Sequence, residues 1–164
     1  MKLESMRGLL LRELADIRDA EEQLTKALPQ MVKAVASPEL RQAFESHLHE
    51  TESQIGRLDR IVALFDEKLP RTSGKAMKGL IDEADELLDA KGDPAVRDAA
   101  LIAAAQRVEH YEIAAYGCAR TFAEAIGLSE AASLLQDSLD EEIAADEKLT
   151  ELAEGMINVQ AAQV

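Results

Sequence analysis

Apolar side chains recur every three or four residues along four long segments of this chain. This spacing constrains the fold more than any other feature, because it places these side chains on one face of an α-helix with 3.6 residues per turn. In the first segment, this apolar face consists of Leu10, Leu14, Ile17, Leu24, Leu28, Met31 and Val35. Alanine, leucine and glutamate are abundant and only 3% of the residues are aromatic, a composition typical of helices. The sequence therefore predicts an all-α protein.

Capping residues followed by proline predict where helices begin. Ser37-Pro38 and Asp93-Pro94 each pair an N-cap side chain with proline at the first helical position. Gly127 is a typical C-cap residue and Ser129 a typical N-cap, so a turn is expected between them. These signals predict long helices over about residues 3–36, 37–65, 93–126 and 129–154.

The chain length and the connections indicate how these helices pack. A chain of 164 residues corresponds to one domain, so residues 1–164 are expected to form a single unit with a bundle core over about 3–154. The connection over residues 66–93 is long and contains its own short helix near 75–90. The prediction is a four-helix bundle made of two antiparallel hairpins joined by this crossover. Pro29 should kink the first helix, because it lacks a backbone N–H.

Acidic and amide side chains interrupt the apolar face of every long helix. Glu21 is the clearest case, since it falls in the series 10, 14, 17, 21, 24, 28, whose other members are apolar. The polar side chains expected to point into the bundle are Glu21, Glu50, Gln54, Glu109, Glu112, Glu142 and Asp146. Charged side chains are almost never fully buried unless they are paired, so these positions need a chemical explanation.

The distances of the acids from the turns place them at one level of the bundle. Glu21 lies 16 residues before Ser37 and Glu50 lies 13 residues after it, so both are roughly 20–24 Å from that turn at 1.5 Å per residue. The second hairpin repeats this spacing to within one residue with Glu112, Ser129 and Glu142. The repeat indicates an internal duplication, in which Glu109 has no counterpart and is expected to be an added ligand or bridge.

Buried carboxylates at one level predict a bound cation. An isolated ionised carboxylate in a low-dielectric core costs several kcal/mol, so such groups must be paired, protonated or bound to cations. No Lys or Arg falls on the inward faces at this level. Two hard divalent or trivalent metal ions would satisfy these oxygen ligands at once. The alternative is that some of the 32 acidic residues reach core positions by chance.

Three further side chains lie near the acids on the helical pattern. His47, one turn before the acid of the second helix, either binds or orients a ligand or is a core histidine held by a neighbour. His110 points about 100° away from Glu109, so it is expected around the ligands or at a helix–helix contact. Tyr116 follows Glu112 at i+4 and either donates a hydrogen bond to it or is a plain core aromatic.

Composition excludes several classes of function. The net charge of −14 argues against nucleic acid, whose phosphates are bound by Lys and Arg. No apolar run approaches the roughly 20 residues that span a bilayer, and the N-terminus has no signal-peptide core, so a cytoplasmic protein is expected. The single cysteine, Cys118, excludes an intrachain disulfide and a CxxC site, and is expected to be a small buried residue. A homodimer is expected because two-fold dimers are the commonest oligomers.

Three segments resemble a known family. They are ELADIRDAEEQLTKALPQMVKA, ESHLHETESQI and RDAALIAAAQRVEHYEIAAYG, and they look like the YciF family of bacterial stress-associated ferritin-like proteins over about residues 9–153. The resemblance implies a ferritin-like bundle that holds two metal ions. Iron is the expected metal, and manganese and zinc are the alternatives. The ferritin pattern has histidine three residues after two of its acids. Here Ser53 and Ala145 stand at those positions, with Gln54 and Asp146 one residue later.

The resemblance and the pattern leave two functions open. One is a di-metal protein that handles iron, peroxide or oxygen under stress, as a ferroxidase or peroxide-consuming enzyme. The other is a non-catalytic structural or interaction bundle with a metal-stabilised or vestigial site. A ligand set poor in nitrogen weighs against oxidase-type reactivity, because the ligands tune the redox behaviour of a metal. The absence of a CxxC motif separates the chain from rubrerythrin-like peroxidases.

Overall fold

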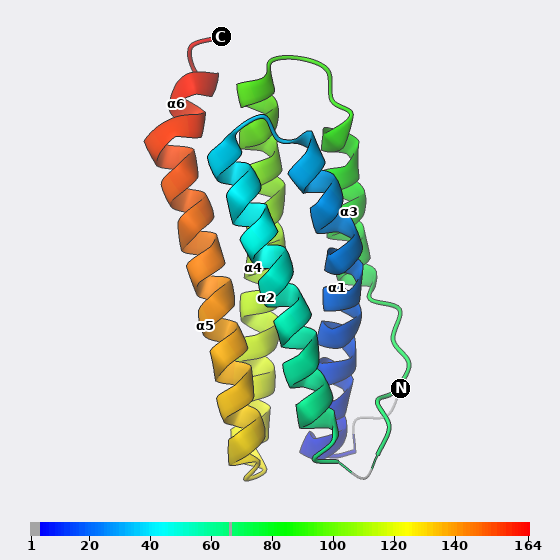
Figure 1. Cartoon of the computed structure of the whole chain (residues 1–164). Helices are drawn as coiled ribbons and strands as arrows, with labels where there is room; N and C mark the ends of the chain where they lie inside the picture. The colour runs from blue at the N-terminus through cyan, green and yellow to red at the C-terminus, as the bar shows by residue number, and fades with distance from the viewer. Residues whose placement is uncertain (1–3, 66) are drawn as a thin grey trace.

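The computed structural model describes residues 4–65 and 67–164, and most of them are helical (Figure 1). The elements are α1 (Met6–Ala34), α2 (Pro38–Val62), α3 (Lys75–Leu88), α4 (Pro94–Ala125), α5 (Ser129–Leu152), a π-helical segment (Ala153–Ile157) and α6 (Asn158–Ala161). Within the described residues there is no strand. The all-α prediction and the order of the five helices of the bundle and crossover are confirmed.

Two antiparallel hairpins form the bundle. The turn between α1 and α2 lies at one end, and the turn between α4 and α5 lies at the opposite end (Figure 1). The crossover returns along the length of the bundle and carries α3, which packs against α1 and α4. Because the two turns are at opposite ends, positions about 24 Å from either turn meet near the middle of a bundle whose helices are roughly 40 Å long.

The helix starts agree with the capping signals at two of the three predicted sites. Ser37 Oγ accepts a hydrogen bond from the Leu40 amide at 3.2 Å, and Asp93 Oδ1 accepts one from Ala95 at 2.8 Å. Ser129 is not a cap: Leu128 occupies the N-cap position of α5 and no side chain caps that end. Leu128 is held there because its amide bonds to the Ala123 carbonyl at 2.9 Å and its side chain packs on the core.

Several helix ends differ from the prediction. Residue 3, where the first helix was expected to start, and residue 66, the start of the expected crossover, lie outside the described residues. Helix α1 stops at Ala34 because Val35 is extended, and α2 stops at Val62. The C-terminal residues carry no sequence signal, yet they continue as the π-helical segment and α6. Pro29 lies inside α1, which continues past it, and the kink stays a prediction.

The core consists of two apolar clusters with a polar level between them. The cluster near the α1–α2 turn includes Leu24, Leu28, Met31, Phe44, Leu101 and Leu149. The cluster near the α4–α5 turn includes Leu10, Leu14, Ile17, Leu58, Tyr116 and Leu135. Each buried leucine stabilises the fold by about 1.5–3 kcal/mol. The polar level contains Glu21 of α1, His47 and Gln54 of α2, Glu109 and Glu112 of α4, and Glu142 of α5, all of them buried, whereas the buried Asp98 lies outside it near the start of α4.

Cys118 contradicts the expectation of a buried cysteine. It is a free, exposed residue. The buried positions of this part of α4 are Tyr116, Ala119 and Ala123, and a residue two positions after Tyr116 points roughly 200° away from it at 100° per residue. Cys118 therefore lies on the outer face. No helix in the described part of the chain is long and apolar enough to cross a membrane.

Candidate metal centre

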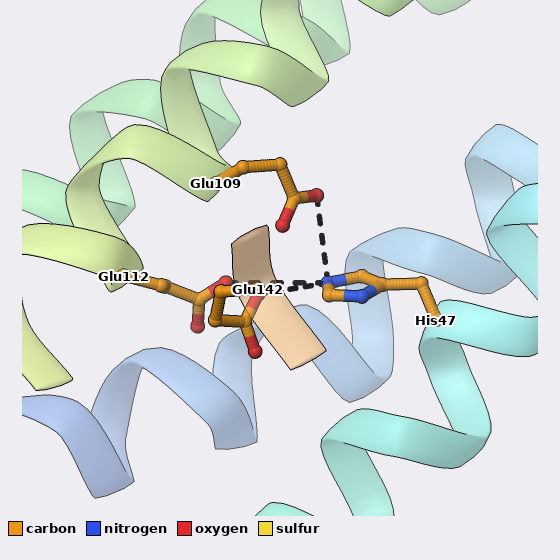
Figure 2. A group of neighbouring side chains, drawn as sticks. All are labelled: His47, Glu109, Glu112 and Glu142. Atoms are coloured by element: carbon orange, nitrogen blue, oxygen red, sulfur yellow. Dashed lines mark ion pairs between the residues drawn. The ribbon is translucent and has the colours of Figure 1, made fainter. Parts of the chain in front are cut away.

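Four buried side chains from three helices converge in the polar level (Figure 2). They are His47 of α2, Glu109 and Glu112 of α4, and Glu142 of α5. Each offers one nitrogen or oxygen atom, and these four atoms lie within 4.8 Å of one another. Helix α4 supplies two of them because residues three apart share a helix face.

The imidazole of His47 lies at the centre of this group. Its Nε2 is 3.5 Å from Glu109 Oε1, 4.0 Å from Glu112 Oε2 and 3.9 Å from Glu142 Oε2. On the other side of the ring, Nδ1 is 3.5 Å from Glu50 Oε2. A carboxylate on one ring nitrogen is the usual way in which a metal-binding histidine is oriented.

The remaining long helix, α1, contributes Glu21, which is fully buried. The Tyr116 hydroxyl donates a hydrogen bond of 2.5 Å to Glu21 Oε1. Of the two roles considered for Tyr116, the hydrogen bond to Glu112 is not made: Tyr116 is a buried core aromatic whose hydroxyl reaches across the bundle to the facing helix. This bond leaves Glu21 Oε2 without a hydrogen-bond partner.

A network of hydrogen bonds between α2 and α5 connects Glu142 of the polar level to more exposed residues. The Gln54 amide donates to Glu142 Oε1 and, at 3.1 Å, to Glu141 Oε2. Arg57 binds both oxygens of Glu141, with Nη1 2.6 Å from Oε2. Sequence reasoning missed Arg57 and Glu141, although Arg57 follows Gln54 at i+3 and Glu141 precedes Glu142, which is the signal that could have found them.

Glu50 and Asp146 lie beside the four-residue group. The Glu50 side chain is 40% exposed, and it reaches the group only through His47. Asp146 Oδ1 is 3.4 Å from His110 Nε2, and the His110 side chain is 70% exposed. His110 thus contacts α5 from outside, one of the two roles expected of it.

Burial raises the pKa values of the four buried glutamates Glu21, Glu109, Glu112 and Glu142. The pKa of Glu21 rises from 4.5 to about 8, first because of desolvation and then because of the nearby charge of Glu142. The pKa values of Glu109 and Glu112 lie well above the ordinary value, again through burial first. Burial raises the pKa of Glu142 as well. Without a cation, the fold favours protonated carboxyls here.

His47 shifts in the opposite sense to an ordinary buried histidine. Burial alone lowers its pKa, but the charges of Glu109 and Glu142 and the contact with Glu50 raise it from 6.5 to about 10. The imidazolium is therefore the cation that faces these carboxylates in the metal-free protein.

Buried polar atoms without a hydrogen-bond partner are concentrated in this level. In the described residues they include Glu21 Oε2, both nitrogens of His47, Thr51 Oγ1, Gln54 Oε1, Glu109 Oε2, both oxygens of Glu112, Glu142 Oε2 and Asp146 Oδ1. By contrast, the buried carboxylate of Asp98 accepts bonds from the amides of Ala36 and Ser37 at 2.7–3.1 Å. Orphaned oxygen and nitrogen acceptors at one place fit the donor set that hard metal ions take.

These features define a class of protein, namely a helical bundle whose core holds a buried centre of carboxylates and histidine. Residues 5–162 match the model of a family described as a domain of unknown function, DUF892. The chain is also 46% identical to Protein YciF of Escherichia coli (strain K12) over 162 residues, 98% of either chain. The chain belongs to this YciF-like family, and the resemblance seen in its helices is confirmed.

Solved structures agree with the fold. The crystal structure of the E. coli stress protein YciF superposes with a TM-score of 0.91 at 46% identity, covering 95% of this chain and 99% of that one. YcfI of Rhodopseudomonas palustris gives 0.86 at 44% identity, covering 91% and 95%. A protein of Xanthomonas campestris pv. campestris gives 0.78 over 98% and 100%, and at 24% identity it shows the fold alone.

Proposed function

We propose that this protein binds two metal ions in the polar level of its bundle. His47 and Glu109 would hold the first ion and Glu21 the second. Glu112 and Glu142 would bridge the two ions, because both lie close to His47 and to Glu21. Each has an oxygen within 4.0 Å of His47 Nε2. Besides burial, the charge of Glu142 raises the pKa of Glu21, and the charge of Glu21 raises the pKa of Glu112. Glu50 would orient His47, with Gln54 and Asp146 beside the pair.

One observation carries this proposal, namely the concentration of unpartnered buried acceptors between two well-packed apolar clusters. A folded core tolerates such groups only if something compensates them. Protonation and the His47 imidazolium compensate part of the charge, but they leave the oxygens of Glu112 without partners. A pair of hard cations would serve all of them together.

Iron is the proposed metal, and the proposed setting is oxidative or iron stress. The support is the ferritin-like arrangement and the name of the relative YciF, a stress protein. Bound iron would supply the electrons for reducing an oxidant, which is the chemistry of a ferroxidase or peroxidase. The chain's own contribution is to hold Glu21 with the Tyr116 hydroxyl and to release the His47 proton when a cation enters.

A structural role is the second candidate. A relative, YcfI, is named as a candidate structural protein, and His47 already gives the metal-free level an internal counter-cation. In this case the ions stabilise the bundle and turn nothing over. The predicted homodimer, single domain and cytoplasmic location, and the absence of nucleic-acid binding, stay predictions.

Metal analysis tests the proposal. Protein purified without chelator and then titrated anaerobically with Fe(II) should bind about two ions per chain and release protons as it does so. The Glu112→Gln variant should lose most of this binding, whereas Glu45→Gln, on the exposed face of α2, should keep it. Binding of less than about one ion per chain would sink the metal-binding function. Metal binding without peroxide or oxygen consumption would select the structural role.

A further inference from the structure

A pocket of about 290 Å³ opens between α2 and α5 and ends at the metal-binding level. Its inner end is formed by His47 and Glu109, and Phe44 and Leu149 form the apolar wall. All four of these residues are buried. The pocket therefore connects the surface with one side of the centre, the side on which His47 lies.

The size of the pocket argues against an oxidant as its only occupant. A water molecule occupies about 30 Å³ of liquid, and peroxide and dioxygen are little larger. The pocket is close to the lower bound of about 300 Å³ for sites that hold small organic ligands. Small side chains, Ala43 of α2 and Ala144 and Ala145 of α5, leave this space between the helices.

The lining selects a neutral ligand with one polar end. Phe44 and Leu149 offer only apolar surface, and the two buried polar residues of the lining are His47 and Glu109 at the inner end. The other polar residues of the lining are exposed or half-buried, namely Glu39, Gln42, Ser46, Glu50 and Lys148. At the rim Lys148 already pairs with Glu151 at 3.2 Å, and Glu39 accepts a hydrogen bond from Ser37 at 3.0 Å. The rim thus carries charges of both signs, and Glu50 faces the His47 imidazole at 3.5 Å, so the lining offers no large excess of one charge to an ionic ligand.

We propose that this pocket binds a compact neutral organic molecule of ring size, with its single hydroxyl or carbonyl oxygen directed at the metal-binding level. The ring lies against Phe44 and Leu149, and the oxygen lies beside His47 and Glu109. The contact of that oxygen with bound metal rests on the proposed function, whereas the apolar wall is present in the metal-free chain. This occupant would be a small substrate or effector of the centre.

Phenol is the probe, with toluene and benzoate as matched compounds. Each is titrated into metal-free and zinc-loaded protein while methyl NMR follows Ala43, Ala145 and Leu149. Phenol should shift these methyl signals and bind at least about tenfold more tightly than toluene, which lacks the oxygen, or benzoate, which is charged. Ala145→Phe fills the pocket and should abolish the shifts. Ala114→Phe, on the exposed side of α4, should keep them.

The outcomes separate this inference from the proposed function. If phenol leaves the pocket methyl signals of the unmodified protein unchanged while zinc binds, the pocket inference is overturned and the metal centre stands. If phenol binds but no metal does, the proposed function fails and the pocket stands. Tighter binding of benzoate overturns the neutral class. The unmodified protein alone decides these cases, even if Ala145→Phe does not fold.

Discussion

At the scale of single residues, two effects determine which groups of the polar level are protonated. Burial raises the pKa of Glu21, and the surrounding carboxylates raise the pKa of His47. His47 is surrounded by carboxylates at 3.5–4.0 Å, which is why its pKa rises to about 10. In the metal-free protein, protons on His47 and on Glu21 compensate the buried negative charge that a metal ion would compensate in the proposed centre. Loss of protons and gain of metal are therefore expected to be linked.

The free energy of unfolding of the metal-free protein should fall as the pH rises from about 4.5 to about 8. In this window folded Glu21, with its pKa of about 8, still binds a proton that the unfolded chain has released near 4.5. The resulting stability is complete below the unfolded pKa and is lost as the pH passes the folded pKa. The raised pKa of Glu112 acts in the same direction, and that of His47 extends the fall toward about 10.

Urea unfolding with a chelator, at several pH values between about 5 and about 8, measures this slope. Glu112→Gln should flatten it, whereas Glu45→Gln should not, since that exposed residue controls for general surface repulsion. Saturating zinc should flatten or reverse it, because metal then replaces the protons. A metal-free stability that rises with pH would contradict the assignment.

The Tyr116→Phe variant should lower the free energy of unfolding by about 1–3 kcal/mol, because it leaves Glu21 Oε1 buried without its donor. Tyr111→Phe is the matched control, as Tyr111 is only partly buried and lies on the same helix. Its effect should stay below about 1 kcal/mol. Equal effects of the two changes, measured by urea unfolding, would show that the Tyr116 hydroxyl does not hold Glu21.

The helical period correctly predicted four buried acids, but it also placed Glu50 inward, whose side chain is 40% exposed, and it could not predict which atoms each acid meets. Glu21, Glu109, Glu112 and Glu142 are all at most 3% exposed, as their places on the apolar faces indicated. The contact of Tyr116 with α1 was missed because sequence spacing describes neighbours along one helix only. Whether a side chain reaches across the bundle depends on the packing of the facing helix.

At the scale of elements, hydrogen bonds between α2 and α5 position Glu142, one of the candidate ligands. Arg57 fixes Glu141, and Glu141 in turn accepts a bond from the Gln54 amide. Gln54 then bonds Glu142. This chain of bonds joins a partly exposed ion pair to a buried candidate ligand, so a surface residue acts on the centre through two others.

Arg57→Met should weaken metal binding by about tenfold or more, because loss of an outer partner typically costs about 10–100-fold in affinity. Arg57→Lys should restore part of it. Arg18→Met is the control, since Arg18 also bridges two helices through Asp59, but its partners are Asp59 and Glu22 and not a candidate ligand. A competition titration with zinc gives the affinities. Equal affinity of Arg57→Met and the unmodified protein would remove Arg57 from the centre.

The helix starts were predictable where the sequence carries a chemical signal. Ser37 and Asp93 each have a side-chain acceptor followed by proline, and both cap their helices. Ser129 has no proline after it and does not cap its helix, because packing of Leu128 on the core fixes the turn one residue earlier. The helical continuation after α5 was missed because Ala153 and Ile157 of the π-helical segment pack on the core, and no capping residue signals this packing.

At the scale of the whole molecule, the bundle is two apolar cores divided by one polar level. The turns of the two hairpins lie at opposite ends (Figure 1), and the near-equal spacings in the two halves place the acids of all four helices at the middle. Three of the four matched acids, Glu21, Glu112 and Glu142, are buried at this level, whereas Glu50 is 40% exposed and His47 takes the inward position on α2. The proposed metal centre combines these three acids with His47 and Glu109.

An anomalous-scattering map of crystals soaked with Fe(II) without oxygen tests the metal centre most directly. The proposal predicts two peaks in the polar level, one beside His47 and Glu109 and one beside Glu21, with Glu112 and Glu142 between them. It also predicts that the peaks disappear in crystals of Glu112→Gln. A map with density only at surface acids, or with none at this level, would contradict the metal centre.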